Sequence, residues 1–379
     1  MKFSDRTGIR FPCWFSLSGI AGLTLSAFLS LMITSDGAAE ENVVRMAPDK
    51  SGHQHELTLR DAIHLALQHN PELAAFSREI QALEGVTLQA GLLKNPELSL
   101  NVENAGNIQK LSGDVNSAHA VAQEVVQQLT TIRVYQILEL GGKREARVNA
   151  ALLSEELAAQ DLAIKRTDII FRIANVFTEV LAAQERLKLA EETKMTAQNV
   201  VNSVSERVQG GKVPPIDETK VKLGLSTTRI ELEQAQRDLS SARKRLALLW
   251  NSSTPNFSKV LGDLEAVIAP PEFESLETRV LGNPVALRAQ KNIEQRKALL
   301  EVEETKRIPN VTINAGAVHH AQLGGSTVVA GLQIPIPVFD RNQGNLKEAH
   351  QRVSKAVDEQ MATELRLKTE LAQSYEALS

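Results

Sequence analysis

The sequence contains one cysteine, Cys13, and few aromatic residues, which make up 4% of its 379 residues. Because Cys13 lies in an apolar N-terminal segment, we expect neither a disulfide framework nor a cysteine nucleophile in the rest of the chain. Basic and acidic residues are interspersed and the net charge is −4, so the clustered basic surface of a nucleic-acid-binding protein is missing. The sequence has no phosphate-binding glycine loop, nucleophile elbow or zinc-helix motif, so we expect no catalytic residue, no enzyme activity and no cofactor.

The N-terminus has the pattern of an export signal. Basic residues precede an apolar run at 11–33 and small residues follow it: Lys2, Arg6, Arg10, Gly37, Ala38 and Ala39. We expect residues 1–39 to be a signal peptide that is cleaved after Ala39, and 40–56 to be an N-terminal segment of the mature chain. Because the apolar run is long for a signal, an uncleaved membrane anchor is the alternative. The position of Cys13 early in the run does not match a lipoprotein cleavage site, so no lipid anchor is expected.

Two pairs of landmarks indicate an internal duplication. Asn70-Pro71 recurs as Asn283-Pro284, and Pro96 recurs as Pro309 with the same spacing along the chain. After each of the latter prolines, apolar and polar residues alternate, which predicts strands. A second strand follows in each half, which gives four strands at about 96–104, 129–139, 309–320 and 326–338. Each is about 9–13 residues long, enough for a tilted strand to cross a bilayer.

Long helices follow the first strand pair. We expect one helix over 143–209, a turn of glycine and proline at 210–215, and a second helix over 216–250. The first would span roughly 100 Å at 1.5 Å per residue. Heptad positions in both helices are almost all apolar, which predicts an antiparallel coiled-coil hairpin. They are Val176, Val180, Ala183, Leu187, Ala190, Lys194, Ala197, Val201, Val204 and Val208, and Val221, Leu225, Thr228, Leu232, Ala235, Leu239, Ala242, Leu246 and Leu249.

The chain therefore divides into a first repeat at 57–250, a linker at 251–275 that contains Pro255, Pro270 and Pro271, and a second repeat at 276–379. The second repeat is shorter. In the first repeat, the stretch from Gly141 to Trp250 is more than twice as long as the corresponding stretch from Asp340 to Ser379. We expect the second repeat to be incomplete, with its helical hairpin ending partway through the first arm. The fold class predicted is mainly α with a transmembrane β part, as two repeats of a strand hairpin and a long helical hairpin.

Two strand-to-helix segments and the helical turn carry a family resemblance. Residues 136–144 (QILELGGKR) and 331–345 (GLQIPIPVFDRNQGN) resemble the strand-to-helix signatures of the TolC-like outer-membrane factors, and in particular of their cobalt–zinc–cadmium efflux branch. The turn at 207–217 (RVQGGKVPPID) is similar to that branch too. The signature residues are Gly141, Gly142, Lys143, Arg144, Pro335, Pro337, Asp340, Arg341, Asn342 and Gly344.

The resemblance implies a homotrimer in the outer membrane of a Gram-negative cell, forming a β-barrel/α-barrel channel. Each copy would give four strands to a twelve-stranded barrel and its helices to a periplasmic tunnel. The implied partners are a periplasmic adaptor (membrane fusion) protein, a proton-driven inner-membrane pump of the RND class and outer-membrane lipid. The implied cargo is a divalent heavy-metal ion such as cobalt, zinc or cadmium. The alternatives are an outer-membrane factor for drugs or peptides, and a non-channel periplasmic coiled-coil scaffold tethered by an uncleaved N-terminal helix.

Elementary physics also requires more than one copy. Four membrane strands in one chain leave two edges with unpaired backbone groups, which is costly in hydrocarbon. Two copies would make eight strands, whose interior is filled by side chains. Three copies make twelve strands, wide enough to conduct.

The helical turn is the strongest candidate site. The resemblance places it at the tunnel mouth, in contact with the adaptor. Asp217, repeated in three copies, would form an acidic ring that attracts cations, and the alternative is an ordinary acidic residue at a helix start. The tip residues are Gly211, Lys212, Val213, Pro214, Pro215 and Asp217.

Charged strand residues and histidines are further candidates. Glu103 and Arg133 are expected to face the barrel lumen, because a charge facing lipid near the midplane costs about 2–4 kcal/mol. Histidine binds zinc well, so two histidine pairs are weak metal candidates. They are otherwise solvated loop residues, because a third ligand is absent nearby in sequence. These residues are His53, His55, His319 and His320.

Overall fold

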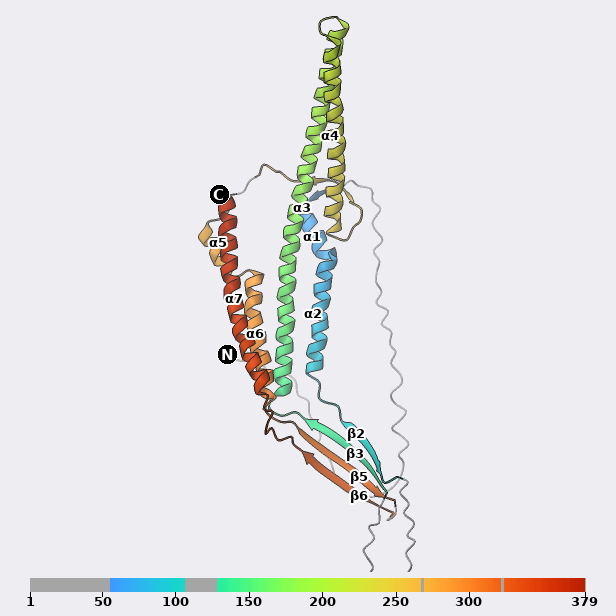
Figure 1. Ribbon diagram of the computed structural model, residues 1–379, viewed down its shortest axis with the longest axis vertical. Coiled ribbons are helices and arrows are strands. Elements are labelled where there is room, and N and C mark those ends of the chain that lie inside the picture. Colours follow the sequence, from blue (N-terminus) through green and yellow to red (C-terminus); the bar gives the residue numbers. More distant parts are fainter. Residues whose placement is uncertain (1–54, 106–127, 267–268, 322–323, 379) are drawn as a thin grey trace, which may run out of the picture. The chain divides into compact units, whose positions relative to one another are not determined.

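The computed structural model describes residues 55–105, 128–266, 269–321 and 324–378. The expected signal peptide at 1–39, the segment at 40–54 and His53 lie outside these ranges. The described elements follow one another as strand, two helices, strand pair and long helix, and this series occurs twice with one further long helix between the two occurrences (Figure 1). Within the described ranges, no helix combines the length and apolarity that crossing a bilayer requires.

The first half begins with a short strand and two helices. β1 (His55–Thr58) leads into α1 (Leu59–His69), which Thr58 and Asp61 start with a reciprocal capping box. α2 (Pro71–Ala90) follows at once, with Asn70 as its N-cap and Pro71 in its first turn. Asn70-Pro71 therefore marks the boundary between two helices.

The strands and the helical hairpin come next. β2 (Glu97–Glu103) and β3 (Leu129–Leu138) form an antiparallel pair, and α3 (Lys143–Gln209) and α4 (Pro215–Leu248) form the long hairpin. The bounds of α3 coincide with those expected from the sequence. All the heptad positions are buried or half-buried, so the apolar seam lies between the two helices.

The second half repeats the first part of this order. α5 (Phe273–Val280) and α6 (Pro284–Thr305) precede β5 (Val311–His320), β6 (Gly325–Gln333) and α7 (Gln343–Leu378). Asn283 caps α6 as Asn70 caps α2, and both helices start with proline. The four long strands make one antiparallel sheet in the order β2-β3-β5-β6. Contacts between elements run from α2 to α3, from α3 to α6 and from α6 to α7, and Figure 1 shows these helices side by side.

Two expectations need correction. The linker at 251–275 contains β4 (Phe257–Leu261), which pairs in parallel with β1, and the linker ends inside α5. Phe257 and Val260 are buried, because this small sheet packs on α3 and α4. The strand expected at 326–338 ends at Gln333, because Pro335 and Pro337 have no amide hydrogen to donate.

The main core lies around the middle of α3. It combines apolar residues of α3 and α4 with residues of α1, α2, β1 and β4. Ile169, Ile173, Val180 and Leu246 are its largest inaccessible side chains, together with Val260. This core fixes the point at which α4 ends and α2 begins along α3.

Candidate channel lining, junctions and helical tip

The two faces of the four-stranded sheet differ in chemistry. Directly opposed residues in antiparallel strands point to the same face, so the pairing register assigns every side chain. One face is apolar and solvent-exposed; for example, Leu98 is 73% and Val328 is 87% exposed. Its apolar members are Leu98, Leu100, Val102, Ile132, Val134, Leu138, Val311, Ile313, Ala315, Ala317, Val328, Ala330 and Leu332, and the same face also carries Thr130, Gln136, His319 and Ser326.

The opposite face is mostly polar and better covered. Thr131 is buried, and Arg133 and Tyr135 are half-buried. Its polar members are Glu97, Ser99, Asn101, Glu103, Thr131, Arg133, Tyr135, Thr312, Asn314, His320, Thr327 and Gln333. This sheet is the reverse of a water-soluble one, in which the apolar face is covered.

Glu103 and Arg133 both lie on the polar face, as the register shows. Arg133 lies over Gly316, its partner on β5; a Cβ atom added to Gly316 would come within 2.8 Å of Arg133 Cγ. Asn314 lies over Gly331 of β6 in the same way, with its amide atoms 2.9 Å from the added Cβ position. Two polar side chains are therefore laid across glycines of the next strand. The sequence reasoning missed both glycines, whose position opposite long polar residues appears only in the register.

The first strand-to-helix junction joins the two halves. Gly141 has φ +76° and packs against Ile308, leaving no room for a Cβ atom. Lys143 donates hydrogen bonds from Nζ to the Ile308 carbonyl and to Asn310 Oδ1. Burial lowers the pKa of Lys143. Gly142, with φ +73°, is the N-cap of α3, and Arg144 is exposed.

Arg147 was not singled out by sequence reasoning, yet it makes the strongest contacts at this junction. Its guanidinium binds both carboxylate oxygens of Glu139, at 2.7 and 2.9 Å, and also donates to the Ala90 carbonyl at 3.4 Å. The bidentate geometry fixes the start of α3 against the end of β3. A basic residue one helical turn after the glycine pair is the signal that could have identified it.

The second junction uses Asn342 instead. This residue has φ +61°, and its amide donates to the Glu303 carbonyl and to Glu303 Oε2, both at 2.8 Å. Asp340 accepts a hydrogen bond from the Asn342 backbone at 2.9 Å. Ala90 and Glu303 occupy corresponding positions of the two repeats, so each half ties the same carbonyl of its first long helix to its own junction. Pro335, Pro337, Arg341 and Gly344 are exposed.

The tip of the hairpin is a tight turn. Gly211 has φ +69°, Lys212 donates from its backbone to the Arg207 carbonyl at 2.8 Å, and Pro214 and Pro215 start α4. Val213 is half-buried, whereas Gly211, Lys212 and both prolines are exposed.

Asp217 lies in the first turn of α4 and pairs with Lys220 at 3.3 Å. Its neighbour Glu218 instead reaches α3, where it accepts from Ser205 Oγ at 2.9 Å. Asp217 therefore does not hold the hairpin together, and its carboxylate remains partly exposed in the single chain.

The histidines do not converge. His55 is the first residue of β1 opposite Phe257, rather than a loop residue. His319 and His320 are strand residues on opposite faces of β5 and lie near the Ser326 and Thr327 hydroxyls, at 3.1 and 3.3 Å. In the described part of the chain, no three metal-binding side chains of the His, Cys, Asp or Glu type come together.

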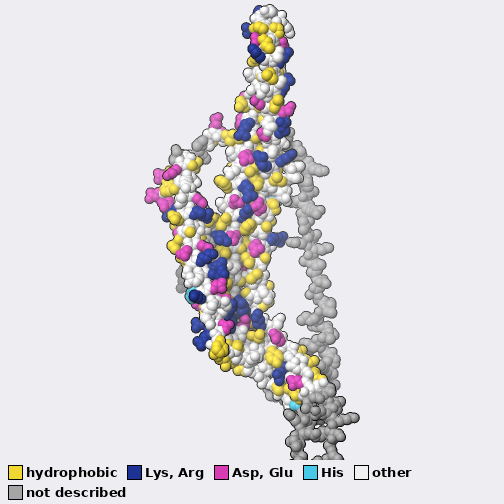
Figure 2. Space-filling model, in the orientation of Figure 1, with side chains coloured by type: hydrophobic (Ala, Val, Ile, Leu, Met, Phe, Trp, Pro, Cys, Tyr) yellow, Lys and Arg dark blue, Asp and Glu magenta, His cyan; other side chains and the backbone are white. Residues whose placement is uncertain are grey.

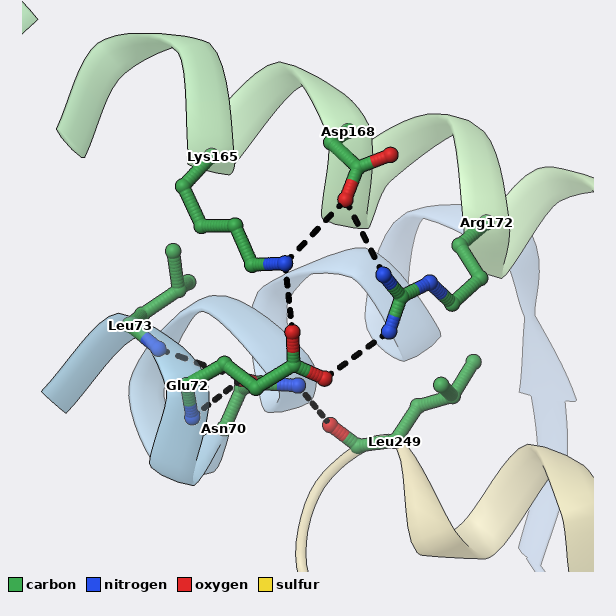
Figure 3. A network of polar contacts seen from close by, with 7 residues as sticks. All are labelled: Asn70, Glu72, Leu73, Lys165, Asp168, Arg172 and Leu249. Atoms are coloured by element: carbon green, nitrogen blue, oxygen red, sulfur yellow. Dashed lines mark hydrogen bonds and ion pairs between the residues drawn. The ribbon is translucent and has the colours of Figure 1, made fainter. Parts of the chain in front are cut away.

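A polar network marks the place where α4 meets α2 (Figure 3). The buried Asn70 accepts from the Glu72 and Leu73 amides and donates to the Leu249 carbonyl at 2.8 Å. Glu72 binds Lys165 at 2.5 Å and Arg172 at 2.8 Å, and Asp168 bridges the same two cations. The end of α4 is thus joined to the start of α2, and α2 to α3.

Comparison with known proteins agrees with this arrangement. The family model described as Outer membrane efflux protein matches residues 62–252. The cobalt-zinc-cadmium resistance protein CzcC of Cupriavidus metallidurans is 35% identical over 323 residues, which cover 85% of this chain and 73% of that protein. This chain belongs to the outer membrane efflux protein family. The resemblance noted in the sequence is confirmed.

Further members are more distant in sequence. The nickel-cobalt-cadmium resistance protein NccC of Alcaligenes xylosoxydans xylosoxydans is 26% identical over 341 residues, which cover 84% of this chain and 76% of that protein. The crystal structure of CusC, a protein described as forming a transmembrane channel, superposes with a TM-score of 0.62 at 17% identity, over 84% of this chain and 74% of that one. The expected fold class and outer-membrane location, with helices extending into the periplasm, are therefore confirmed for this outer membrane efflux protein.

Proposed function

We propose that this outer membrane efflux protein is one protomer of a trimeric channel for divalent heavy-metal ions. The observation that carries the channel proposal is the reversed sheet, which exposes its apolar face and covers the middle of its polar face at Thr131, Arg133 and Tyr135. Such a sheet is suited to lipid on one side and to an aqueous lumen on the other.

The edges of the sheet support an assembly of several copies. β2 and β6 each have a strand neighbour on one side only within the described residues. Unpaired backbone groups cost several kcal/mol each in hydrocarbon, so identical copies must complete the cylinder. Three copies give twelve strands, and Glu103 and Arg133 then line the lumen.

The cargo is proposed from the relatives. CzcC and NccC are named for resistance to cobalt, zinc, cadmium and nickel, and the chain covers about three quarters of each. A divalent metal ion is therefore favoured over a drug or peptide. We place the periplasmic adaptor at the tip residues Gly211 to Pro215, and the RND pump beyond it.

Location and assembly can be tested together. We expect the full chain to fractionate with the outer membrane and to migrate as a heat-modifiable trimer. A periplasmic scaffold would instead appear in the soluble or inner-membrane fraction, which would refute the channel. With its adaptor and pump, the protein should raise resistance to cobalt, zinc or cadmium; resistance to organic compounds alone would refute the metal assignment.

Asp217 provides a test of the tip. In three copies its carboxylates would form an acidic ring at the entrance, which raises the local concentration of cations. We expect Asp217→Ala to lower metal resistance while leaving the amount of trimer unchanged. Glu233→Ala, an exposed acidic position further along α4, is the matched control. Equal metal resistance of the Asp217 variant and the parent would refute the proposed acidic ring.

A further inference from the structure

The two strand hairpins are the same structure twice, and each strand of the first has a fixed counterpart in the second. Ser99 lies opposite Arg133 in the first hairpin, and Thr312 lies opposite Gln333 in the second. β2 therefore corresponds to β5 with Ser99 matching Thr312, which is the same spacing that relates Asn70 to Asn283. β3 corresponds to β6 with Arg133 matching Gln333. The spacing between these two residues is slightly smaller than the spacing between Ser99 and Thr312. The helix starts agree, because Gly142 and Asn342 both have positive φ and are separated by this smaller spacing.

Within one chain, the structure also shows how the first strand hairpin pairs with the second. β3 pairs with β5, and Arg133 lies opposite Gly316. If the same rule continues around the cylinder, β6 of one copy pairs with β2 of the next. In that joint, Gln333 of β6 takes the place that Arg133 has in β3, and Glu103 of β2 takes the place that Gly316 has in β5.

We propose that Gln333 of one copy lies directly opposite Glu103 of the neighbouring copy, so that residues 333–338, which follow β6 in the single chain, extend antiparallel along β2 of the neighbour. This inference rests on the proposed multi-copy channel and adds the register of its joint. Both residues are on the polar face, where the Gln333 amide donates to the Glu103 carboxylate.

The apolar face continues across the same joint. In this register Ile334 lies opposite Val102, and Ile336 lies opposite Leu100 of the neighbouring copy. Ile336 is 81% and Leu100 is 65% exposed in the single chain, so the joint would cover two exposed apolar side chains. Pro335 and Pro337 remove amide donors only at alternate residues, which leaves the donors of Ile334 and Ile336 on one side of the segment.

Competing registers can be ranked by the faces they produce. A shift of one residue would turn Glu103 toward the lipid, because side chains alternate between faces. A shift of two residues keeps both faces and places Gln333 opposite Asn101 instead. The side-chain chemistry allows that alternative, and only the repeat geometry argues against it.

Cysteine cross-linking separates the two registers. The sequence has only Cys13, so a Cys13→Ser background is free of other thiols. We would compare Gln333→Cys with Glu103→Cys against Gln333→Cys with Asn101→Cys in outer-membrane vesicles. Both an oxidant and a short bis-alkylating linker would be used, because a disulfide forms only where the Cβ atoms lie about 3.5–4.5 Å apart. Each single-cysteine variant must first yield the heat-modifiable trimer.

We expect the 333/103 pair to give covalent trimers severalfold more efficiently than the 333/101 pair. Preferential linking of 333/101, equal linking of both, or no linking in a sample that contains trimer would overturn the register while leaving the channel intact. No linking together with no trimer in the outer membrane for the Cys13→Ser parent would overturn the channel and the register with it.

Discussion

The α3–α4 hairpin and the four-stranded sheet place their apolar residues in opposite environments. In the hairpin, every heptad position is covered, and charged residues of both signs are scattered over the outside of the helices (Figure 2). In the sheet, most side chains of the apolar face are exposed, whereas Thr131, Arg133 and Tyr135 in the middle of the polar face are buried or half-buried. The helical hairpin therefore has the residue arrangement suited to water, and the sheet has the arrangement suited to lipid.

The contacts between helices differ along α3 as well. Toward the tip, α3 meets α4 through an apolar seam. Toward the sheet, α3 meets α6 through polar pairs, including Arg288–Asp161 and Lys291–Glu156. Ion pairs also cross between helices within one repeat, as between Arg245 of α4 and Glu179 of α3, so the α3–α4 contact differs by its continuous apolar seam rather than by a lack of ion pairs. Ion pairs at exposed positions contribute little stability, so the hairpin and its central core are expected to dominate the stability of the helical part.

The largest expected effect is a cavity in the helical core. Leu246 is completely inaccessible, and Leu246→Ala should lower the free energy of unfolding by about 2–5 kcal/mol, since the lost methyl groups leave a cavity. Denaturant titration followed by helical circular dichroism would measure the loss. Leu248→Ala, at a 60% exposed position nearby on the same helix, is the control and should cost much less. An unchanged midpoint for Leu246→Ala would contradict the observed core.

A charge on the lipid face of the sheet should have the next largest effect. Leu100→Arg should destabilise the inserted protein by about 2–4 kcal/mol, because arginine near the bilayer midplane is poorly solvated. Asn101→Arg, at the adjacent position and on the polar face, should insert nearly normally. The heat-modifiable fraction in vesicles of a zwitterionic phospholipid would measure both. Equal insertion of the two variants, or poorer insertion of Asn101→Arg, would reverse the assignment of the faces.

The joint between α4 and α2 should respond more weakly. Asn70→Ala removes the cap of α2 and its hydrogen bond to the Leu249 carbonyl, which should cost about 0.5–2 kcal/mol. Asn283→Ala removes the corresponding cap of α6, where the side chain accepts only from the Val285 amide among the contacts of the described chain. We therefore expect a larger loss of thermal stability for Asn70→Ala than for Asn283→Ala. Equal losses would show that the Leu249 contact contributes nothing.

Local patterns in the sequence were sufficient for the long elements. Alternation located the strands, heptads located the hairpin, and the matched spacing of the Asn-Pro pairs and the later prolines indicated the duplication. The sequence did not predict the β1–β4 pair, because its strands are short and lie far apart in the sequence. Only the tertiary packing around Phe257 reveals it. Gly316 was missed for a similar reason, since its role depends on Arg133, a partner distant in sequence, whereas Arg147 pairs mainly with Glu139, which is nearby in sequence.

The smallest expected effect is a pH dependence in the helical part. The hydrogen bond from Lys165, assisted by Arg172, lowers the pKa of Glu72, although burial opposes this shift. Because the folded pKa is below the unfolded one, the stabilisation is complete above the ordinary glutamate value of about 4.3 and is lost as pH falls through the folded pKa. The Glu72 side chain is 43% exposed, so the contribution should be less than about 1 kcal/mol. Glu72→Gln should lower the thermal midpoint slightly at pH 6 and reduce the further drop of the midpoint on acidification to pH 3. Glu79→Gln, at an exposed position of the same helix, is the control and should leave the thermal midpoint at pH 6 unchanged. A Glu72→Gln variant with the parent's full pH dependence would show that the ion pairs seen in Figure 3 do not stabilise the helical part.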